Sequence, residues 1–256
     1  MKKTTIHLEK LNYVETEEVK TLRTNIMFCG KEKRVIMVTS NVMGEGKSTT
    51  AIRLAASLAE VKKNVLLIDL DLRKSVLPSR MHATDVDKGM SHFLSGQSGL
   101  SDVVMATNIS RLHVIFAGRY APNPTELLSS SRFQSLITYV RNLYDYIILD
   151  VPPLGMVVDA AIVAQQCDGA ILVLESGAIK YRLAQETKNK IEEAGCPVLG
   201  AVLTKVDRRQ QGRYYGKYYG KYYGHQEPEE EQMPVEGLLS QEEFELEIQQ
   251  NLSEKE

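Results

Sequence analysis

Six stretches of this chain are almost continuously apolar, and many of their members are Val, Ile or Leu. Apolar runs of this length are typical of strands that are buried on both faces of a parallel sheet. The predicted strands are RVIMVTS (34–40), VLLIDL (65–70), RLHVIFAG (111–118), YIILDV (146–151), GAILVLE (169–175) and PVLGAVLT (197–204). The pattern therefore predicts a mostly parallel sheet as the core of the protein.

Segments with helical periodicity alternate with these strands. They cover residues 47–61, roughly 124–143, 159–166 and 180–194. Asn123 followed by Pro124 is a favourable helix start, and Asp159 is expected to cap the helix that follows it. This alternation predicts right-handed crossovers and an α/β, doubly wound sheet. Ligands in such folds bind beyond the carboxyl ends of the strands.

The first predicted strand runs into SNVMGEGKSTT (40–50), which leads into a predicted helix. A glycine-rich turn in this setting presents backbone N–H groups, a Lys and a hydroxyl residue to phosphate and magnesium. Asn41 stands where the full Walker A pattern has its first Gly, and Asn tolerates unusual backbone angles. The alternative is a purely structural turn. The predicted nucleotide-binding residues are Gly44, Glu45, Gly46, Lys47, Ser48 and Thr49.

Three carboxylates stand at the predicted carboxyl ends of two strands: Asp69 and Asp71 in IDLDL, and Asp150 in the Walker B-like IILD. Carboxylates gathered there repel one another unless a cation lies between them, and Mg²⁺ prefers oxygen ligands. In an Asp-x-Asp pair, one side chain can hold the metal while the other orients or deprotonates a nucleophile. The alternative is that one of the three only caps the next turn.

Composition excludes several classes of protein. The chain has no run of about 18 apolar residues that would span a membrane, and MKKTTIHLEK lacks the apolar core of a signal peptide. Three widely spaced cysteines, Cys29, Cys167 and Cys196, indicate reduced thiols in the cytoplasm, and no Cys or His spacing indicates a metal site. No nucleic-acid partner is expected.

The C-terminal part differs from the rest in tyrosine content and charge. RRQQGRYYGKYYGKYYGHQ carries six of the twelve tyrosines as three YYG copies, and its regular Gly disfavours both helix and strand. Residues 227–256 hold eleven Glu and one Lys, a net charge of −10, which leaves about +8 for residues 1–226. Such tails are usually disordered, although residues 240–252 have the spacing of a short amphipathic helix.

Taken together, these motifs resemble those of the bacterial tyrosine kinases. The resemblance rests on the Walker A loop, the second motif IDLDLR, the Walker B segment ending in Asp-x-Pro-Pro, APNPTELL (121–128) and the C-terminal tyrosines. More narrowly, residues 10–224 are similar to the free-standing cytoplasmic kinases of capsular and exopolysaccharide synthesis in Gram-positive bacteria. The fold implied is a P-loop NTPase of the deviant Walker type.

The resemblance implies an ATP- and Mg²⁺-dependent protein-tyrosine kinase that phosphorylates its own tyrosine cluster. Asp69 is then the base for the tyrosine hydroxyl. The implied catalytic residues are Lys47, Asp69, Asp71 and Asp150. The implied magnesium ligands are Ser48, Asp71 and Asp150. Weak candidates for contact with the adenine are Lys205 and Asp207. The implied phosphorylation sites are Tyr214, Tyr215, Tyr218, Tyr219, Tyr222 and Tyr223, for which the alternative is a sticky low-complexity string.

The implied organisation has three parts. They are a kinase domain with an N-terminal oligomerisation helix (1–207), a flexible tyrosine cluster (208–225) and an acidic tail (226–256), disordered or a short helix. Expected partners are a membrane-anchored activator of the polysaccharide co-polymerase type, further copies of the chain in a ring, a cognate tyrosine phosphatase and protein substrates. The activator would recruit this cytoplasmic protein to the inner face of the cell membrane.

The oligomerisation motif of the family matches EEVKTLR, which gives Glu17, Lys20 and Arg23. Lys20 replaces an Arg, and a Lys does not pair with a carboxylate in the same two-point way. The alternative for these three charges is a solvated helix face.

Three other functions compete with the kinase. A switch ATPase like the chromosome-partitioning and division-site proteins shares the fold, but those proteins carry a second lysine early in the loop, where this chain has Val42. A GTPase is suggested by TKVD (204–207), in which Thr204 replaces the Asn that reads guanine. A nonenzymatic scaffold would use the tyrosine string and tail for docking, and the three carboxylates argue against it.

Overall fold

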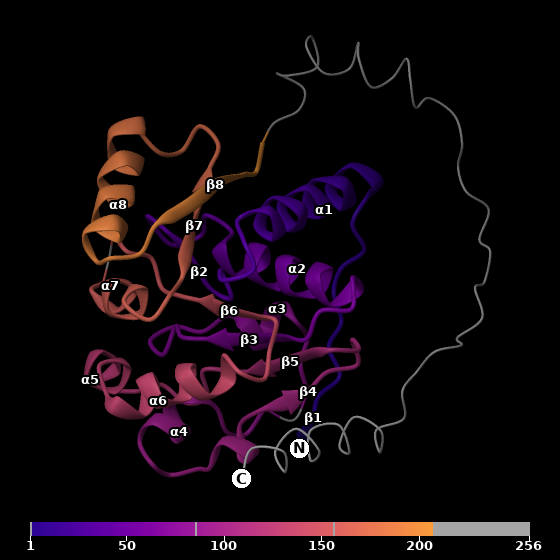
Figure 1. Cartoon of the computed structure of the whole chain (residues 1–256), viewed down its shortest axis with the longest axis vertical. Coiled ribbons are helices and arrows are strands. Elements are labelled where there is room, and N and C mark those ends of the chain that lie inside the picture. The colour runs from indigo at the N-terminus through magenta and orange to yellow at the C-terminus, as the bar shows by residue number, and fades with distance from the viewer. Residues whose placement is uncertain (1, 85, 156, 207–256) are drawn as a thin grey trace, which may run out of the picture. The chain divides into compact units, whose positions relative to one another are not determined.

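The structure, a computed structural model, describes residues 2–84, 86–155 and 157–206 (Figure 1). The strands are β1 (Lys2–Lys3), β2 (Val35–Ser40), β3 (Val65–Asp69), β4 (Met105–Ala106), β5 (Leu112–Ile115), β6 (Tyr146–Asp150), β7 (Gly169–Glu175) and β8 (Val198–Thr204). The helices are α1 (Tyr13–Phe28), α2 (Lys47–Glu60), α3 (Leu77–Arg80), α4 (Met90–Leu94), the 3₁₀ helix η1 (Leu100–Asp102), α5 (Pro124–Leu128), α6 (Ser131–Val140), α7 (Asp159–Ala164) and α8 (Tyr181–Glu193). The predicted tyrosine cluster and acidic tail lie outside the described residues.

The strands form one sheet in the order β1-β4-β5-β3-β6-β2-β7-β8. Neighbouring strands are parallel throughout, except that β4 and β5 are antiparallel. The chain runs from β2 outward through β3 to β5, returns to insert β6 between β3 and β2, and continues on the other side through β7 and β8 (Figure 1). The prediction of a doubly wound, mostly parallel α/β sheet is confirmed.

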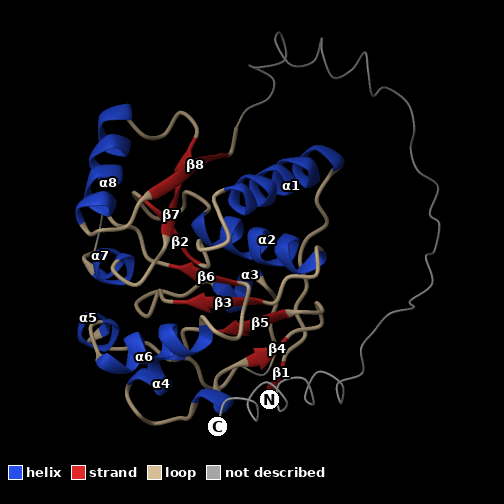
Figure 2. Ribbon diagram, in the orientation of Figure 1, coloured by secondary structure: helices blue, strands red, loops and turns tan. Residues whose placement is uncertain are grey.

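Helices cover both faces of this sheet (Figure 2). One face packs against α2 and α3, and the other against α4 to α8. Side chains alternate along each strand, so that Ile36 and Val38 of β2 join the α2 layer while Val35 and Met37 join the opposite one. Each central strand is therefore apolar on both faces, which is why the sequence shows continuous apolar runs.

The predicted strands and helices are present with small shifts at their ends, apart from the segment 124–143. That segment forms two helices, α5 and α6, with a break at Ser129 and Ser130. The side chain of Ser130 accepts a hydrogen bond of 3.4 Å from the N–H of Phe133 and so begins a new helix. Pro124 is the first residue of α5, as predicted, but the Asn123 side chain makes no capping hydrogen bond.

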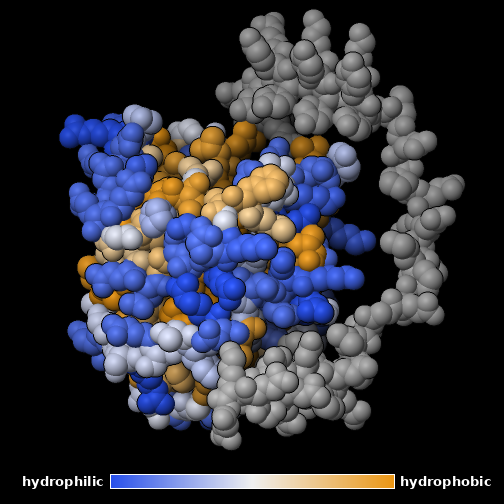
Figure 3. Space-filling view, in the orientation of Figure 1, coloured by the Kyte–Doolittle hydropathy of each residue, from blue (hydrophilic) through white to orange (hydrophobic). Residues whose placement is uncertain are grey.

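The surface near the end of the described chain is partly apolar. Figure 3 shows apolar side chains gathered over β7 and β8, between α8 and α1. β8 is the edge strand on this side of the sheet, and its Leu203 side chain is 60% exposed.

Among the described residues, no helix combines the length and the apolar character that a membrane-spanning segment needs.

A buried histidine lies on β5. His113 is hydrogen bonded to the hydroxyl of Tyr144 at 2.8 Å, and the two rings meet edge to face with centroids 5.6 Å apart. Burial lowers the pKa of His113 to about 4 and raises the pKa of Tyr144 well above its ordinary value. Both side chains are therefore neutral at physiological pH.

We expect the free energy of unfolding to fall as the pH drops from about 6.5 to about 4. Across this range the imidazole of His113 binds a proton in the unfolded chain but not in the folded one, so protons favour unfolding. The loss is on the order of 3 kcal/mol. Urea unfolding at a series of pH values should show a shallower pH dependence for His113→Gln, with exposed His7→Gln as the control. Equal slopes for His113→Gln and the wild type would contradict this origin.

Candidate functional site

The phosphate loop connects the end of β2 to the start of α2. Gly44 and Gly46 have φ angles of 88° and 92°, a left-handed conformation that other residues rarely adopt. Gly46 also packs tightly, because a Cβ there would lie 3.2 Å from Cγ2 of Thr204 at the end of β8. The loop thus delivers the chain to a helix N-terminus, where N–H groups and the helix dipole favour an anion.

Glu45 holds the loop closed from within. Its side chain is buried, and Oε2 accepts hydrogen bonds from the N–H of Asn41 at 2.7 Å and of Val42 at 2.8 Å. The hydroxyl of Thr204 donates to the Glu45 carbonyl at 2.7 Å. The carboxylate of Glu45 therefore binds the backbone of the loop and its carbonyl binds the end of β8, which leaves its backbone N–H for a phosphate.

Asn41, at the position of the first Walker A glycine, has a negative φ. Its Oδ1 accepts a hydrogen bond of 2.6 Å from the hydroxyl of Thr187 on α8, and both residues are buried. Gly155 packs against its carbonyl, because a Cβ at that position would lie 2.3 Å from the oxygen. The departure from the Walker pattern is thus accommodated by a polar contact with α8 and not by an unusual backbone conformation.

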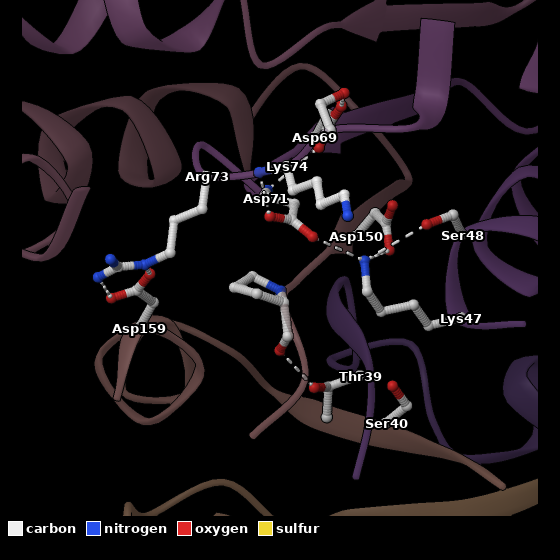
Figure 4. Close-up of polar contacts among 12 residues, drawn as sticks. Thr39, Ser40, Lys47, Ser48, Asp69, Asp71, Arg73, Lys74, Asp150 and Asp159 are labelled. Atoms are coloured by element: carbon white, nitrogen blue, oxygen red, sulfur yellow. Dashed lines mark hydrogen bonds and ion pairs between the residues drawn. The ribbon is translucent and has the colours of Figure 1, made fainter. Parts of the chain in front are cut away.

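The strand order brings the three predicted carboxylates together. Asp69 ends β3 and Asp150 ends β6, and the two are partners in the parallel ladder. β6 is also paired with β2, whose end leads into the phosphate loop. Asp71 lies two residues beyond Asp69, and its N–H donates to Asp69 Oδ1 at 3.1 Å. All three carboxylates therefore face the loop at one edge of the sheet (Figure 4).

The ammonium of Lys47 lies between two of these carboxylates (Figure 4). Its Nζ is 3.3 Å from Asp71 Oδ2 and 3.2 Å from Asp150 Oδ1, and it donates to the hydroxyl of Ser48 at 3.3 Å. Lys47, Asp71 and Asp150 are each less than 10% exposed. The first residue of α2 is thus joined to the ends of two different strands.

Burial and charge act against each other at this site. Burial lowers the pKa of Lys47, but the carboxylates of Asp150 and Asp71 raise it by more, so the net shift is upward and the side chain stays cationic. Burial, together with the adjacent charge of Asp150, raises the pKa of Asp69 to about 7. Burial also raises the pKa of Asp150 against the attraction of Lys47. Asp69 therefore changes charge near neutral pH, which suits a group that accepts a proton.

One oxygen of the site fits a metal ion. Asp150 Oδ2 is buried and has no hydrogen-bond partner among the described residues. A buried, unpaired carboxylate oxygen is unfavourable, and a hard cation such as Mg²⁺ would satisfy it. The described residues contain no group of three or more His, Cys, Asp or Glu side chains that could hold a metal by themselves. Mg²⁺ needs no such group, because it binds one or two carboxylates and shares the rest of its shell with phosphates and water.

Ser75 is a site residue that sequence reasoning missed. Its hydroxyl donates to Asp69 Oδ2, while the N–H of Asp71 is bound to Asp69 Oδ1. The hydrogen bond from Ser75 also opposes the rise in the pKa of Asp69. A serine in an irregular loop six residues after the carboxylate carries no periodicity or motif that would have identified it.

The prediction that Asp159 caps a helix is wrong. The residue at the cap position of α7 is Val158, and Asp159 begins the helix with its carboxylate turned elsewhere. That buried carboxylate accepts hydrogen bonds from Arg73 at 2.7 Å and 3.1 Å and from the hydroxyl of Thr125 at 2.9 Å. The two-point pair directs Arg73 away from Lys47 and fastens the loop after β3 to α7 (Figure 4).

The other residues predicted to contact the nucleotide are Thr49, Lys205 and Asp207. Thr49 is exposed on the first turn of α2, and its hydroxyl accepts a hydrogen bond of 3.1 Å from Arg80. Lys205 follows β8 and forms an ion pair of 2.7 Å with Glu175 at the end of β7. Asp207 lies outside the described residues. The Lys205 ammonium thus already has an anionic partner, and its other N–H donors remain for a second contact.

The three charges of the predicted oligomerisation motif lie on α1. Glu17 and Lys20 form an ion pair of 2.7 Å and are both about half exposed. Arg23 instead reaches α2, where it donates to the carbonyl and the hydroxyl of Ser57, each at 3.0 Å. Within one chain, Arg23 thus anchors α1 to α2, and the Glu17–Lys20 pair stays at the surface.

The sequence of this chain is similar to those of known proteins. A family model described as an AAA domain matches residues 33–187. Tyrosine-protein kinase CpsD of Streptococcus agalactiae serotype III (strain NEM316) is 46% identical over 194 residues, which are 75% of this chain and 84% of that protein. The chain belongs to the bacterial tyrosine-protein kinases. The cluster of Lys47, Asp69, Asp71 and Asp150 is the candidate active site of this kinase.

Solved structures agree with this assignment. The kinase domain of the Escherichia coli tyrosine kinase ETK superimposes with a TM-score of 0.70 at 30% identity and covers 75% of this chain and 77% of that one. The cell division ATPase MinD of Pyrococcus furiosus has a TM-score of 0.60 at 23% identity, covering 69% of this chain and 75% of that one, which shows a common fold alone. The predicted deviant-Walker P-loop fold is confirmed.

We expect Glu45→Ala to lower the free energy of unfolding by roughly 2–4 kcal/mol, because it leaves two N–H groups of the phosphate loop without their charged acceptor. Glu45→Gln keeps one acceptor oxygen and should lose less. Urea unfolding without nucleotide would measure both, with the exposed Glu193→Ala as the control. An unchanged midpoint for Glu45→Ala would mean that this carboxylate does not hold the loop.

Proposed function

We propose that this tyrosine kinase uses Mg²⁺ and ATP to phosphorylate its own C-terminal tyrosines and so regulates capsular or exopolysaccharide synthesis. The observation that carries the proposal is the buried cluster in which Lys47 contacts Asp71 and Asp150, with Asp69 beside them, in a chain of this family. It combines a phosphate-binding cation, metal-binding oxygens and a proton acceptor at one edge of the sheet.

We propose a role for each residue of the cluster toward the cofactor. Bound Mg·ATP supplies the phosphoryl group and neutralises part of the charge that develops on transfer. Lys47 and the N–H groups of the phosphate loop hold the phosphates, while Asp71, Asp150 and the hydroxyl of Ser48 hold the magnesium. The unpaired oxygen of Asp150 supports this division. Lys205 and Asp207 are proposed to contact the adenine.

Asp69 accepts the proton of the attacking tyrosine hydroxyl in this proposal. With a pKa of about 7, its carboxylate is available at neutral pH and yet basic enough to take a proton. Each of its oxygens already accepts one hydrogen bond, from the N–H of Asp71 and the hydroxyl of Ser75. A carboxylate oxygen has a second lone pair, so a phenol can be bound without breaking either contact.

The proposed substrates within the chain are the tyrosines of the cluster, 208–225, which follows the kinase domain, 1–207, and precedes the acidic tail, 226–256. Support comes from the course of the described chain, because Thr204, close to its end, contacts Gly46 of the phosphate loop. We propose that transfer occurs between neighbouring copies. The modified residues are Tyr214, Tyr215, Tyr218, Tyr219, Tyr222 and Tyr223.

Assembly and release follow from charge. We propose a ring held through α1, in which the surface charges of Glu17 and Lys20 contact a second copy. Each phosphate adds about −1.5 to −2 charge, so several of them overcome the five cations that precede or separate the tyrosines and open the ring. These cations are Arg208, Arg209, Arg213, Lys217 and Lys221. A membrane-anchored activator brings the kinase to the inner face of the membrane, and a cognate phosphatase restores the unmodified tyrosines.

Lys47→Met is expected to abolish phosphorylation of the cluster, because it removes the cation that binds the phosphates. Intact-mass spectrometry of protein expressed in bacteria should show increments of one phosphate that map to residues 214–223 in the wild type and are absent from the variant. Lys31→Ala, an exposed lysine before β2, is the matched control. Circular dichroism establishes that Lys47→Met is folded.

A chain that remains unmodified is then assayed with a peptide from the cytoplasmic segment of a candidate activator. ATP turnover with unmodified tyrosines in the presence of that peptide would overturn the kinase proposal. It would favour a switch ATPase despite Val42 at the position of the second loop lysine.

A further inference from the structure

Lys74 lies beside the site but has no role in the function described so far. It follows Asp71 by three residues in the loop after β3, and its backbone N–H donates to Asp71 Oδ1 at 3.0 Å. Its main chain is therefore fixed to a carboxylate that itself contacts the ammonium of Lys47. The side chain starts within reach of the phosphate loop.

The two basic residues of this loop diverge. Arg73 turns toward α7, where its guanidinium is held by both oxygens of Asp159. Figure 4 shows the side chain of Lys74 extending the opposite way, with its ammonium pointing toward the cluster of Asp150 and Lys47. Arg73 is thus occupied by a structural contact, and Lys74 is the cation of the pair that faces the site.

The ammonium of Lys74 is also uncommitted. Lysines form ion pairs at positions 20, 47, 188 and 205, whereas the part of the chain that the structure describes contains no ion pair of Lys74. The residue is exposed. A lysine ammonium is a good ligand for phosphate oxygens, and here no other anion has to be displaced first.

The charges of the site give a reason for a second cation such as Lys74. Lys47 faces two carboxylates directly, so much of its charge is already compensated before a nucleotide arrives. A triphosphate brings further negative charge to the same edge of the sheet. The loop position where switch ATPases carry a second lysine holds Val42, which is apolar and 43% exposed. The phosphate loop therefore supplies no second lysine, whereas Lys74 is placed to supply one from another segment (Figure 4).

We propose that Lys74 is a phosphate-binding residue that contacts the terminal phosphate of Mg·ATP from the loop after β3. The proposal rests on the nucleotide site of the proposed function, and it adds a residue outside the phosphate loop to that site. Because the backbone of Lys74 is bound to Asp71, its contact is directed to the end of the nucleotide that the metal-binding carboxylates face. Lys74 therefore distinguishes ATP from ADP.

The test is nucleotide binding by the full chain, measured by isothermal titration calorimetry with Mg·ATP and with Mg·ADP. Lys74→Ala should weaken Mg·ATP binding about tenfold, the effect of one charge-assisted hydrogen bond, and change Mg·ADP binding less than about twofold. Lys74→Arg retains the charge and should keep most of the affinity for Mg·ATP. Lys31→Ala, an exposed lysine at the amino end of β2, should bind both nucleotides like the wild type.

Unchanged Mg·ATP affinity in Lys74→Ala would overturn the proposal. Equal weakening for Mg·ATP and Mg·ADP at an unchanged melting temperature would overturn it as well, since the contact would not be with the terminal phosphate. Lys74→Gln serves as the second variant if Lys74→Ala melts early. Calorimetry measures nucleotide binding and not phosphoryl transfer, so a chain that binds Mg·ATP but leaves its tyrosines unmodified even with the activator peptide refutes the proposed kinase activity and leaves this result standing. A chain that binds neither nucleotide refutes both.

Discussion

The contact of the Lys47 ammonium with Asp71 and Asp150 is the interaction on which the rest of the site depends. It joins the start of α2 to the ends of β3 and β6 in a place that water hardly reaches. Buried charges are costly to desolvate and are tolerated only when each has a close partner. Removing the lysine would leave carboxylates that repel one another, and removing the carboxylates would strand an ammonium. The cluster therefore stabilises the domain only as a unit, and the same excess of carboxylate oxygen prepares it for a metal ion.

The sequence predicts much of the fold because the central strands are covered on both faces. Their continuous apolar runs, and the glycines and lysine between β2 and α2, leave few other interpretations. What sequence does not reveal is that β6 lies between β3 and β2. Strand neighbours are decided by packing between distant segments, and Asp69 meets Asp150 only because of that order. The strands β1 and β4 were also beyond prediction, since each is two residues long and β1 consists of Lys2 and Lys3.

The predictions that failed at single residues also failed because of contacts between segments that are distant in the sequence. Asp159 has the residue type and position of a helix cap, yet its carboxylate binds Arg73, which is 86 positions away in the sequence. Glu45 belongs to the phosphate loop as predicted, but its side chain holds the backbone of Asn41 and Val42. In each case a local rule names the right segment, and a neighbour supplied by the fold decides what the polar atoms do. Local rules fail most often for polar side chains at strand ends, because several loops converge there and offer other hydrogen-bond partners.

Kinases of this family and division ATPases share a fold. The difference between their reactions must therefore lie in a few side chains at the carboxyl ends of the strands. A phosphate loop with carboxylates at the ends of β3 and β6 can direct a phosphoryl group to water or to a phenol. Here the predicted base, Asp69, is fully buried and held at both oxygens by Asp71 and Ser75. A base so enclosed has no contact with bulk solvent, so any nucleophile that it deprotonates, water or phenol, must first enter the site. Thr204, the last residue of β8, donates its hydroxyl to the Glu45 carbonyl, so the end of this strand is fixed to the phosphate loop. The choice between water and a phenol therefore depends on which group the site admits next to Asp69, and not on the presence of the carboxylates alone.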